Sequence, residues 1–202
     1  MIAVIDYDAG NIKSVIKAVE HLGGTVRLTR DREEILSADH IILPGVGNFG
    51  DCMEKLRGYD LEDVVHEAVG RNIPFLGICL GLQLLFEDSE EALGVRGLAV
   101  LDGHVRRIPD GEGRKVPNIG WCSLEYQNDG RVFKPVSGED EDVYFVHSYY
   151  LQAEDESIVK AVTDYGVHIH AAVESGNVFG CQFHPEKSSL VGLEMLKRFL
   201  EV

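Results

Sequence analysis

Residues 75–83 read Phe-Leu-Gly-Ile-Cys-Leu-Gly-Leu-Gln, and they constrain the fold more than any other segment. The apolar first half is typical of a buried strand, and the chain then turns into a helix at Cys79, between Gly77 and Gly81. This is the pattern of a nucleophile elbow with cysteine in the place of serine. The glycines allow close approach of strand and helix, and free N–H groups at the helix start favour the reactive thiolate. A buried core cysteine beside a tight turn is the alternative.

Residues 1–90 alternate short apolar runs with amphipathic runs. Apolar runs bounded by turn residues predict strands, and apolar residues three or four positions apart predict helices. We expect strands over residues 2–5, 26–28, 40–43 and 74–78, and helices over residues 11–22, 32–38, 50–56 and 61–69. Single helices between strands imply the α/β class, with a doubly wound and mostly parallel sheet. Catalytic groups should then lie at the carboxyl ends of its strands.

After residue 95 the pattern changes to short β-branched or aromatic runs divided by Gly, Asn and Asp. They predict an appended antiparallel or mixed β section with strands over residues 98–101, 116–126, 143–151, 158–163, 167–173 and 178–183. A last helix is expected over residues 188–200, with a buried side formed by Leu190, Leu193, Leu196, Phe199 and Leu200. No Pro-rich or Ser-rich linker separates the two parts, so we expect residues 1–202 to form one domain.

The composition argues against several classes of function. A formal net charge of −15 disfavours nucleic-acid binding, which needs Lys and Arg to replace counterions. The longest uncharged apolar run, residues 73–86, is too short and too interrupted by glycine and proline to span a membrane. The chain opens on a strand-like run without a secretory signal, and its 4 cysteines form no C-x-x-C pair. We therefore expect reduced thiols and a cytoplasmic protein.

A cysteine nucleophile needs a base and a group that orients the base. Among the 8 histidines, His184 stands out because it ends an apolar strand in the segment Gly-Cys-Gln-Phe-His-Pro-Glu. Pro185 ends the strand, and Glu186 can fold back to accept a hydrogen bond from the imidazole. The alternative is a histidine that caps a strand end, followed by a glutamate that starts a helix. His168 and His170 share a strand face, but no third ligand lies at metal spacing, so no metal site is expected.

Together, G-I-C-L-G-L-Q and Q-F-H-P-E resemble the motifs of the class I (triad) glutamine amidotransferases, and the resemblance covers nearly the whole chain. It implies a flavodoxin-like fold and hydrolysis of L-glutamine without a cofactor. In that family a cysteine attacks the side-chain amide, ammonia leaves, and water releases glutamate from the thioester. Matched motif to motif, the resemblance makes Cys79 the nucleophile, His184 the base and Glu186 the orienting acid.

The resemblance also implies which residues surround the substrate. The oxyanion would be stabilised by the N–H of the residue after the nucleophile and by a glycine-rich loop, which together comprise Leu80, Gly45, Val46 and Gly47. Gln83, one helical turn after Cys79, resembles the family's glutamine-contacting residue. The family's H-S/T-Y segment, which binds the α-amino and α-carboxylate groups, is matched by His147, Ser148 and Tyr149. An ordinary tight turn, a polar helix residue and alternating strand packing would also produce these three features.

Three further segments resemble the glutaminase subunits of imidazole glycerol phosphate synthases, enzymes of histidine biosynthesis. They are the opening D-Y-D-A-G-N, the loop P-G-V-G at residues 44–47, and P-N-I-G-W at residues 117–121. Two positions depart from that pattern, since Asp8 replaces a glycine and Cys122 an asparagine. Aspartate tolerates left-handed backbone angles, so we expect little effect of Asp8.

For these glutaminases the resemblance implies a heterodimer in which ammonia passes to a separate (β/α)8-barrel cyclase subunit. The glutaminase is nearly idle until the partner and its ligand are bound. Loops that carry Asn11, Trp121 and Lys187 would contribute to the interface, with a core position as the alternative for Trp121. Other possible functions are a glutaminase subunit of anthranilate, aminodeoxychorismate or pyridoxal phosphate synthase, a non-catalytic regulatory module, and a cysteine protease or esterase with the same elbow.

Overall fold

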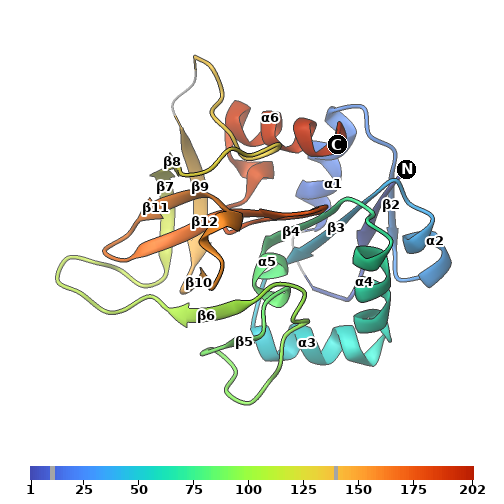
Figure 1. Ribbon diagram of the computed structural model, residues 1–202, viewed down its shortest axis with the longest axis horizontal. Coiled ribbons are helices and arrows are strands. Elements are labelled where there is room, and N and C mark those ends of the chain that lie inside the picture. The colour runs from blue at the N-terminus through green and yellow to red at the C-terminus, as the bar shows by residue number, and fades with distance from the viewer. Residues whose placement is uncertain (10–11, 139–140) are drawn as a thin grey trace.

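The computed structural model describes residues 1–9, 12–138 and 141–202. These residues form an eight-stranded main sheet (Figure 1). Its parallel part runs in the order β2 (Val26–Thr29), β1 (Ile2–Ile5), β3 (His40–Gly45), β4 (Phe75–Cys79) and β13 (Val178–Cys181). Its antiparallel part continues with β12 (His168–Ser175), β11 (Val159–Asp164) and β8 (Glu125–Tyr126). The predicted α/β class, with a parallel core and an appended antiparallel section, is confirmed.

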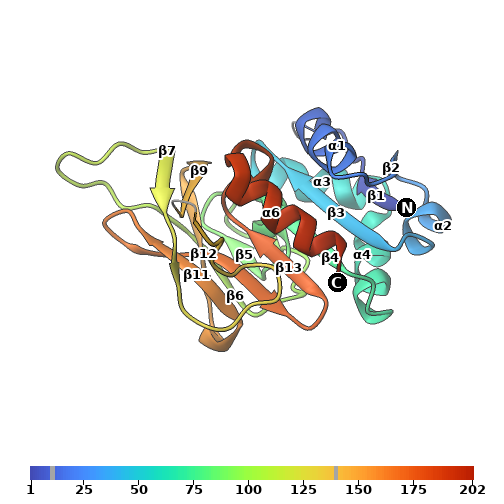
Figure 2. The same ribbon diagram turned by 90° about the horizontal axis from the view of Figure 1, so that it is seen from above.

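Other elements cover both faces of this sheet, as Figure 2 shows from above. One face packs against α1 (Ile12–His21), α6 (Ser189–Leu200) and the antiparallel pair β7 (Asn118–Ser123) and β9 (Asp142–His147). The other face packs against α2 (Arg32–Leu36), α3 (Phe49–Gly58), α4 (Leu61–Gly70) and a small sheet of β5 (Asp88–Ser89), β6 (Gly103–Arg107) and β10 (Tyr149–Ala153). Each face therefore has its own apolar core, and the strands between the cores are buried on both sides.

Short elements complete the chain and connect to the strand ends. Helix α5 (Leu80–Leu84) follows β4 directly, and a single turn of 3₁₀ helix, η2 (Pro185–Lys187), follows β13. Another 3₁₀ turn, η1 (Glu156–Ile158), precedes β11. Because β13 pairs in parallel with β4, the segments that follow both strands leave the sheet side by side, at the carboxyl ends of the strands.

The strand expected over residues 98–101 is wrong. Ala99 has a left-handed φ of +49°, which breaks an extended run. The amides of Leu98 and Val100 instead donate to the carbonyls of Leu84 and Leu85 at the end of α5. Leu98 and Leu101 are still buried, so the apolar pattern reports a loop packed into the core rather than a strand. The strand of this region is β6, which begins just afterwards at Gly103.

Three further expectations need correction. The expected strands over residues 116–126 and 143–151 are each two strands, β7 with β8 and β9 with β10, and the second pair is interrupted at Ser148. Strand β13 is parallel to β4 and belongs to the parallel part of the sheet. On α6, Leu190 is 61% exposed, whereas Val191 and Met195 are buried. The helix begins at Ser189. Leu196 and Phe199 are buried as expected, and Leu193 and Leu200 pack partly buried against the same core, so among the five residues Leu190 is the wrong one.

Candidate active site

Cys79 lies at the end of β4 in a strained turn. Its φ and ψ are +54° and −111°, which only a strongly constrained non-glycine residue adopts. The flanking glycines permit this turn, since a Cβ on Gly81 would lie 1.9 Å from the carbonyl oxygen of Leu43, and one on Gly77 would lie 2.8 Å from that of Gly81. The strand, the turn and α5 therefore form the elbow that the sequence indicates, with the cysteine at its apex.

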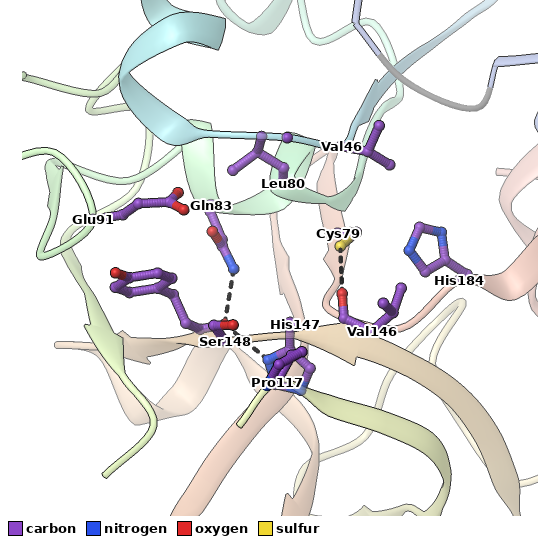
Figure 3. Close-up of a pocket in the computed structure, with 12 residues that line it drawn as sticks. Val46, Cys79, Leu80, Gln83, Glu91, Pro117, Val146, His147, Ser148 and His184 are labelled. Atoms are coloured by element: carbon purple, nitrogen blue, oxygen red, sulfur yellow. Dashed lines mark hydrogen bonds between the residues drawn. The ribbon is translucent and has the colours of Figure 1, made fainter. Parts of the chain in front are cut away.

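His184 is brought beside Cys79 by the pairing of β13 with β4. The register sets Gly180 opposite Gly77 and Cys181 opposite Ile78, so the residues that follow these strands lie next to each other. Figure 3 shows the His184 ring beside the Cys79 sulfur. The turn η2 brings Glu186 back, and its Oε1 lies 2.9 Å from His184 Nδ1, with both side chains almost fully buried. Within the described residues, His184 Nε2 has no hydrogen-bond partner.

The charge of His184 depends on both neighbours. Burial alone would lower the pKa of its imidazole, but contacts with the Cys79 sulfur and the Glu186 carboxylate outweigh burial and raise that pKa to about 9. The ring is therefore protonated at neutral pH. A protonated imidazole beside a cysteine sulfur favours a thiolate–imidazolium pair, the arrangement of an activated cysteine nucleophile.

A cavity of about 290 Å³ opens over the cysteine (Figure 3). Its walls come from the loop after β3, the elbow with α5, the β9–β10 junction and the start of β7. The lining residues are Val46, Gly47, Cys79, Leu80, Gln83, Glu91, Pro117, Val146, His147, Ser148, Tyr149 and His184. The structure thus brings together at one cavity nearly all the residues singled out for catalysis and glutamine binding.

Gly45 is the exception among the loop residues, because it lies beneath the cavity rather than in its wall. A Cβ at this position would lie 2.5 Å from the backbone nitrogen of Gly81, so only glycine allows the loop to pack on the elbow. Val46 and Gly47 form the wall, and Gly47 has a φ of +111°. Below them, the Tyr7 hydroxyl donates to the Pro44 carbonyl over 2.7 Å.

His147 lines the opposite wall as a neutral ring. Burial lowers the pKa of His147 to about 4. The charge of His184 adds to this lowering, and the hydrogen bond to the Tyr149 carbonyl opposes it. Its Nδ1 donates to the Tyr149 carbonyl over 2.8 Å, and its Nε2 accepts from Asn118 Nδ2 over 3.3 Å. Since both ring nitrogens are engaged, His147 holds the cavity wall in place and is not a second base.

Gln83 projects from α5 toward the same wall. Its Nε2 donates to the Tyr149 carbonyl over 3.0 Å and to Gln182 Oε1 over 2.8 Å. Both amide hydrogens are therefore used inside the protein, and Oε1 remains as its acceptor for a ligand.

Glu91 also lines the cavity, although no sequence pattern singles it out. Its Oε2 accepts the backbone N–H of Phe49 over 2.8 Å at the start of α3, and partial burial raises the pKa of this carboxyl group. Among the described residues of the cavity wall, Glu91 contributes the one carboxylate. It lies in an acidic stretch of a loop, and nothing in that pattern distinguishes it from its exposed neighbour Glu90.

Two of the residues expected at an interface, Trp121 and Lys187, lie next to the ring of Tyr144. Trp121 is 52% exposed, which contradicts a core position, and its ring contacts that of Tyr144 edge to face at 5.8 Å. Lys187 Nζ lies 5.8 Å from the centroid of the same Tyr144 ring. Ile119 is 60% exposed next to Trp121 on β7. Asn11 lies outside the described residues.

The two departures from the family pattern fit their surroundings. Asp8 has a φ of +57°, a left-handed value that aspartate tolerates, and its carboxylate accepts from Arg30 over 2.9 Å. Cys122 lies on β7, and its sulfur accepts from Asn118 Nδ2 over 3.7 Å.

The sequence predicts no metal site at His168 and His170, although the two share a strand face. His170 Nδ1 accepts the backbone N–H of Ala153 over 3.1 Å and is therefore not free for an ion. In the described part of the chain, Glu87, His104 and Glu154 do place ligand atoms within 4.8 Å of one another. That group is partly exposed, and Nδ1 of its histidine is bonded to Asp88.

Comparison with known proteins identifies the family. The family described as "Glutamine amidotransferase class-I" matches residues 3–202. The chain belongs to this family. It is 48% identical over 201 residues to "Imidazole glycerol phosphate synthase subunit HisH" of Moorella thermoacetica, covering 100% of this chain and 94% of that protein. It is 44% identical over 202 residues to the HisH subunit of Methanocaldococcus jannaschii, with 100% of both chains covered.

Solved structures agree on the fold. A structure titled "Crystal structure of glutamine amidotransferase" matches with a TM-score of 0.76 and 22% identity, covering 100% of this chain and 98% of that chain. "Structure of PurLQS from Thermotoga maritima" matches with a TM-score of 0.72 and 23% identity, covering 99% and 97%. This amidotransferase is thus an enzyme whose full-length relatives are HisH subunits. None of the helices in its described part is long and apolar enough to span a membrane.

Proposed function

We propose that the chain is the glutaminase subunit of an imidazole glycerol phosphate synthase, which hydrolyses L-glutamine and passes the ammonia to a cyclase. The observation that supports this most is the arrangement of Cys79, His184 and Glu186 at the bottom of one cavity, in a chain similar to HisH over its full length. The two apolar cores on one shared sheet support residues 1–202 as a single domain. Four free cysteines support a cytoplasmic location.

The cavity would bind glutamine with its side-chain amide toward the sulfur. The Glu91 carboxylate and the free Oε1 of Gln83 are acceptors for the α-ammonium group at the far end. The backbone of Ser148 and Tyr149 borders the same end and would hold the α-carboxylate. A ligand that lacks the ammonium group would leave Glu91 without a counter-charge, so the site selects amino acids over simple amides.

In the first half of the reaction, the Cys79 thiolate attacks the side-chain carbonyl carbon, and a C–S bond forms. The carbonyl oxygen becomes an oxyanion, with the N–H of Leu80 and the backbone of Val46 and Gly47 as its stabilising donors. The C–N bond then breaks while His184 Nε2 gives its proton to the nitrogen. Ammonia leaves, and a γ-glutamyl thioester and a neutral His184 remain.

The second half reverses the role of His184. Its neutral Nε2 takes a proton from water, and the water oxygen attacks the thioester carbon. The C–S bond breaks, glutamate is released, and the sulfur leaves as a thiolate beside the re-formed imidazolium. Glu186 keeps Nδ1 as the donor to its carboxylate throughout, so Nε2 is always the nitrogen that faces the substrate.

The partner would be a (β/α)8-barrel cyclase that covers the cavity mouth. The support is the exposed apolar and cationic surface formed by Ile119, Trp121, Tyr144 and Lys187, together with the exposed Val46 of the loop. Large exposed aromatic side chains at the centre of such a surface are typical anchors of an interface. Asn11 is proposed for the same interface from its sequence motif.

The test is co-purification with the barrel cyclase of an imidazole glycerol phosphate synthase, followed by a glutaminase assay with and without the cyclase ligand. We expect a stable one-to-one complex and glutamine hydrolysis that rises strongly when the ligand binds. A ligand-bound complex that does not hydrolyse glutamine would contradict the activity. Failure to bind the cyclase, with binding to an anthranilate or aminodeoxychorismate synthase instead, would contradict the partner.

A further inference from the structure

Gln182 lies directly against the nucleophile. Its side-chain Nε2 is 3.6 Å from the Cys79 sulfur, a distance within the range of an N–H···S hydrogen bond. The residue is 0% exposed, so no water competes for this contact. The backbone N–H of Gln182 donates to the Ala171 carbonyl over 2.8 Å, and this bond fixes the residue just after the end of β13, beside β12.

The orientation of the Gln182 amide follows from its neighbours. The Tyr149 carbonyl can only accept, so the Gln83 atom 3.0 Å from it must be the nitrogen. The same Gln83 nitrogen lies 2.8 Å from the Gln182 side chain, so the Gln182 atom at this contact must be the oxygen. The Gln182 NH₂ group is therefore turned toward the Cys79 sulfur and cannot flip without losing two bonds.

A donor aimed at the sulfur distinguishes between the two states of the cysteine. A thiolate accepts such a bond strongly, because hydrogen bonds to a charged group are stronger than those between neutral groups. A neutral thiol accepts it weakly. The contact thus lowers the free energy of the thiolate relative to the thiol, and the buried position of the Gln182 amide strengthens it.

The other groups near the sulfur do not duplicate this contact. Burial raises the pKa of Tyr7 and of Cys181 well above their usual values, and burial lowers that of His147, so these groups are neutral at pH 7. Glu91 is the carboxylate of the cavity wall and would disfavour a second negative charge. His184, with Glu186 behind it, supplies the positive charge.

We propose that Gln182 is a further catalytic residue, whose side-chain N–H stabilises the Cys79 thiolate and its return as leaving group. Its amide also connects the sulfur to the cavity wall through Gln83 and the Tyr149 carbonyl. This role deepens the proposed glutaminase function and rests on it, but the stabilisation of the thiolate can be measured without glutamine.

The experiment compares the full chain with Gln182→Met, which keeps the side-chain length and removes the donor. The rate of Cys79 alkylation by iodoacetamide is followed by peptide mass spectrometry as a function of pH. Loss of a hydrogen bond to a charged group should slow the reaction at neutral pH about tenfold to a hundredfold and move the profile about one to two pH units upward. Gln152→Met makes the same change on the exposed side of β10 and should leave the profile unchanged.

A second measurement needs no substitution at the site. In the chain labelled with [¹⁵N]glutamine, the side-chain amide proton of Gln182 should shift downfield with the same pH midpoint as Cys79 alkylation, and this titration should be absent in Cys79→Ser. An unchanged alkylation profile in folded Gln182→Met, or a Gln182 amide signal that does not follow Cys79, would overturn the proposal. A chain that hydrolyses no glutamine but shows both effects would contradict only the proposed function.

Discussion

The two sides of the cavity differ in how completely the chain itself encloses them. On the catalytic side, Cys79 is 6% and His184 2% exposed, and both are fixed by strand pairing and hydrogen bonds. On the outer rim, Val46 is 39% and Trp121 52% exposed, although both side chains are apolar. The reacting groups are thus set in place by the fold, whereas the rim has an apolar surface that none of the described residues covers. The difference suggests that chemistry is built into this chain and that its control lies on the rim.

Removal of the nucleophile on the catalytic side should have the largest effect on activity. Cys79→Ala should abolish glutamine hydrolysis while the chain remains folded, because no other thiol lies at the cavity. The cyclase reaction of the complex should survive when ammonium salt at alkaline pH replaces glutamine, as measured by product formation. Loss of the ammonium-dependent reaction as well would show that the catalytic side has a role beyond ammonia supply.

His184→Ala should be the next largest loss. It removes the proton donor for the leaving ammonia and the base for water, so the turnover number for glutamine should fall by at least about a thousandfold. Hydrolysis is measured as glutamate release by the complex. A loss below tenfold would mean that another group moves these protons. His147 could not be that group, because its pKa is about 4 and both of its ring nitrogens are hydrogen-bonded.

Glu186→Gln should cost less, about tenfold to a few hundredfold in turnover, because it removes orientation and charge but no proton-transfer group. The Glu186 carboxylate contributes to raising the pKa of His184 to about 9, so its neutralisation should lower that pKa. Activity that depends on the imidazolium falls as pH rises through this pKa. In the variant, activity should therefore begin to fall at a lower pH on the alkaline side of the profile than in the parent chain. If this fall occurs at the same pH in both proteins, the Glu186 carboxylate does not raise the pKa of His184.

Glu91→Gln tests the substrate side of the division. Loss of a charge-assisted contact to the α-ammonium group should raise the KM for glutamine about tenfold to a hundredfold, with a smaller change in kcat. The glutamine oxygen can still accept the Phe49 N–H, so the fold should be preserved. Glu90→Gln, the same change at the exposed neighbour, is the control and should leave KM unchanged. Equal effects of the two variants would exclude a direct contact with substrate.

The smallest effect on the isolated chain is expected at the rim. Trp121→Ala should leave the isolated chain folded, since half of the side chain is already in water. The same variant should weaken cyclase binding or ligand-stimulated hydrolysis. Trp121 is the chain's one tryptophan, so its fluorescence should shift when the cyclase is added. If the variant unfolds, and the fluorescence of the parent chain does not change when the cyclase is added, Trp121 belongs to the core and not to the interface.

The same two sides differ in how far the sequence could predict them. The elbow and the His-Pro-Glu turn were predictable, because local patterns of glycine and proline dictate the backbone at Cys79 and Glu186. The parallel strands β1, β3 and β4 were predictable because they are apolar on both faces. The strand expected over residues 98–101 failed because an apolar pattern does not show that Ala99 has a positive φ.

Residues that act through tertiary contacts were harder to find. Glu91 looks like any acidic loop residue, and only the fold brings it to the same cavity as Gln83. Gln182 lies inside the recognised motif, but its contact with the Cys79 sulfur depends on a buried chain of amides from three different elements. A one-dimensional pattern carries no information about which way those amides face.

If this chain alone builds the catalytic side around one cysteine, an active-site label should react at that cysteine. The full chain is treated with a glutamine-derived electrophile, with and without excess glutamine, and the modified cysteines are identified by mass spectrometry. We predict labelling at Cys79 that glutamine prevents, and none at the others, because burial raises the pKa values of Cys52, Cys122 and Cys181. Labelling concentrated on another cysteine, or labelling of Cys79 that glutamine does not slow, would show that Cys79 is not the nucleophile of a glutamine site.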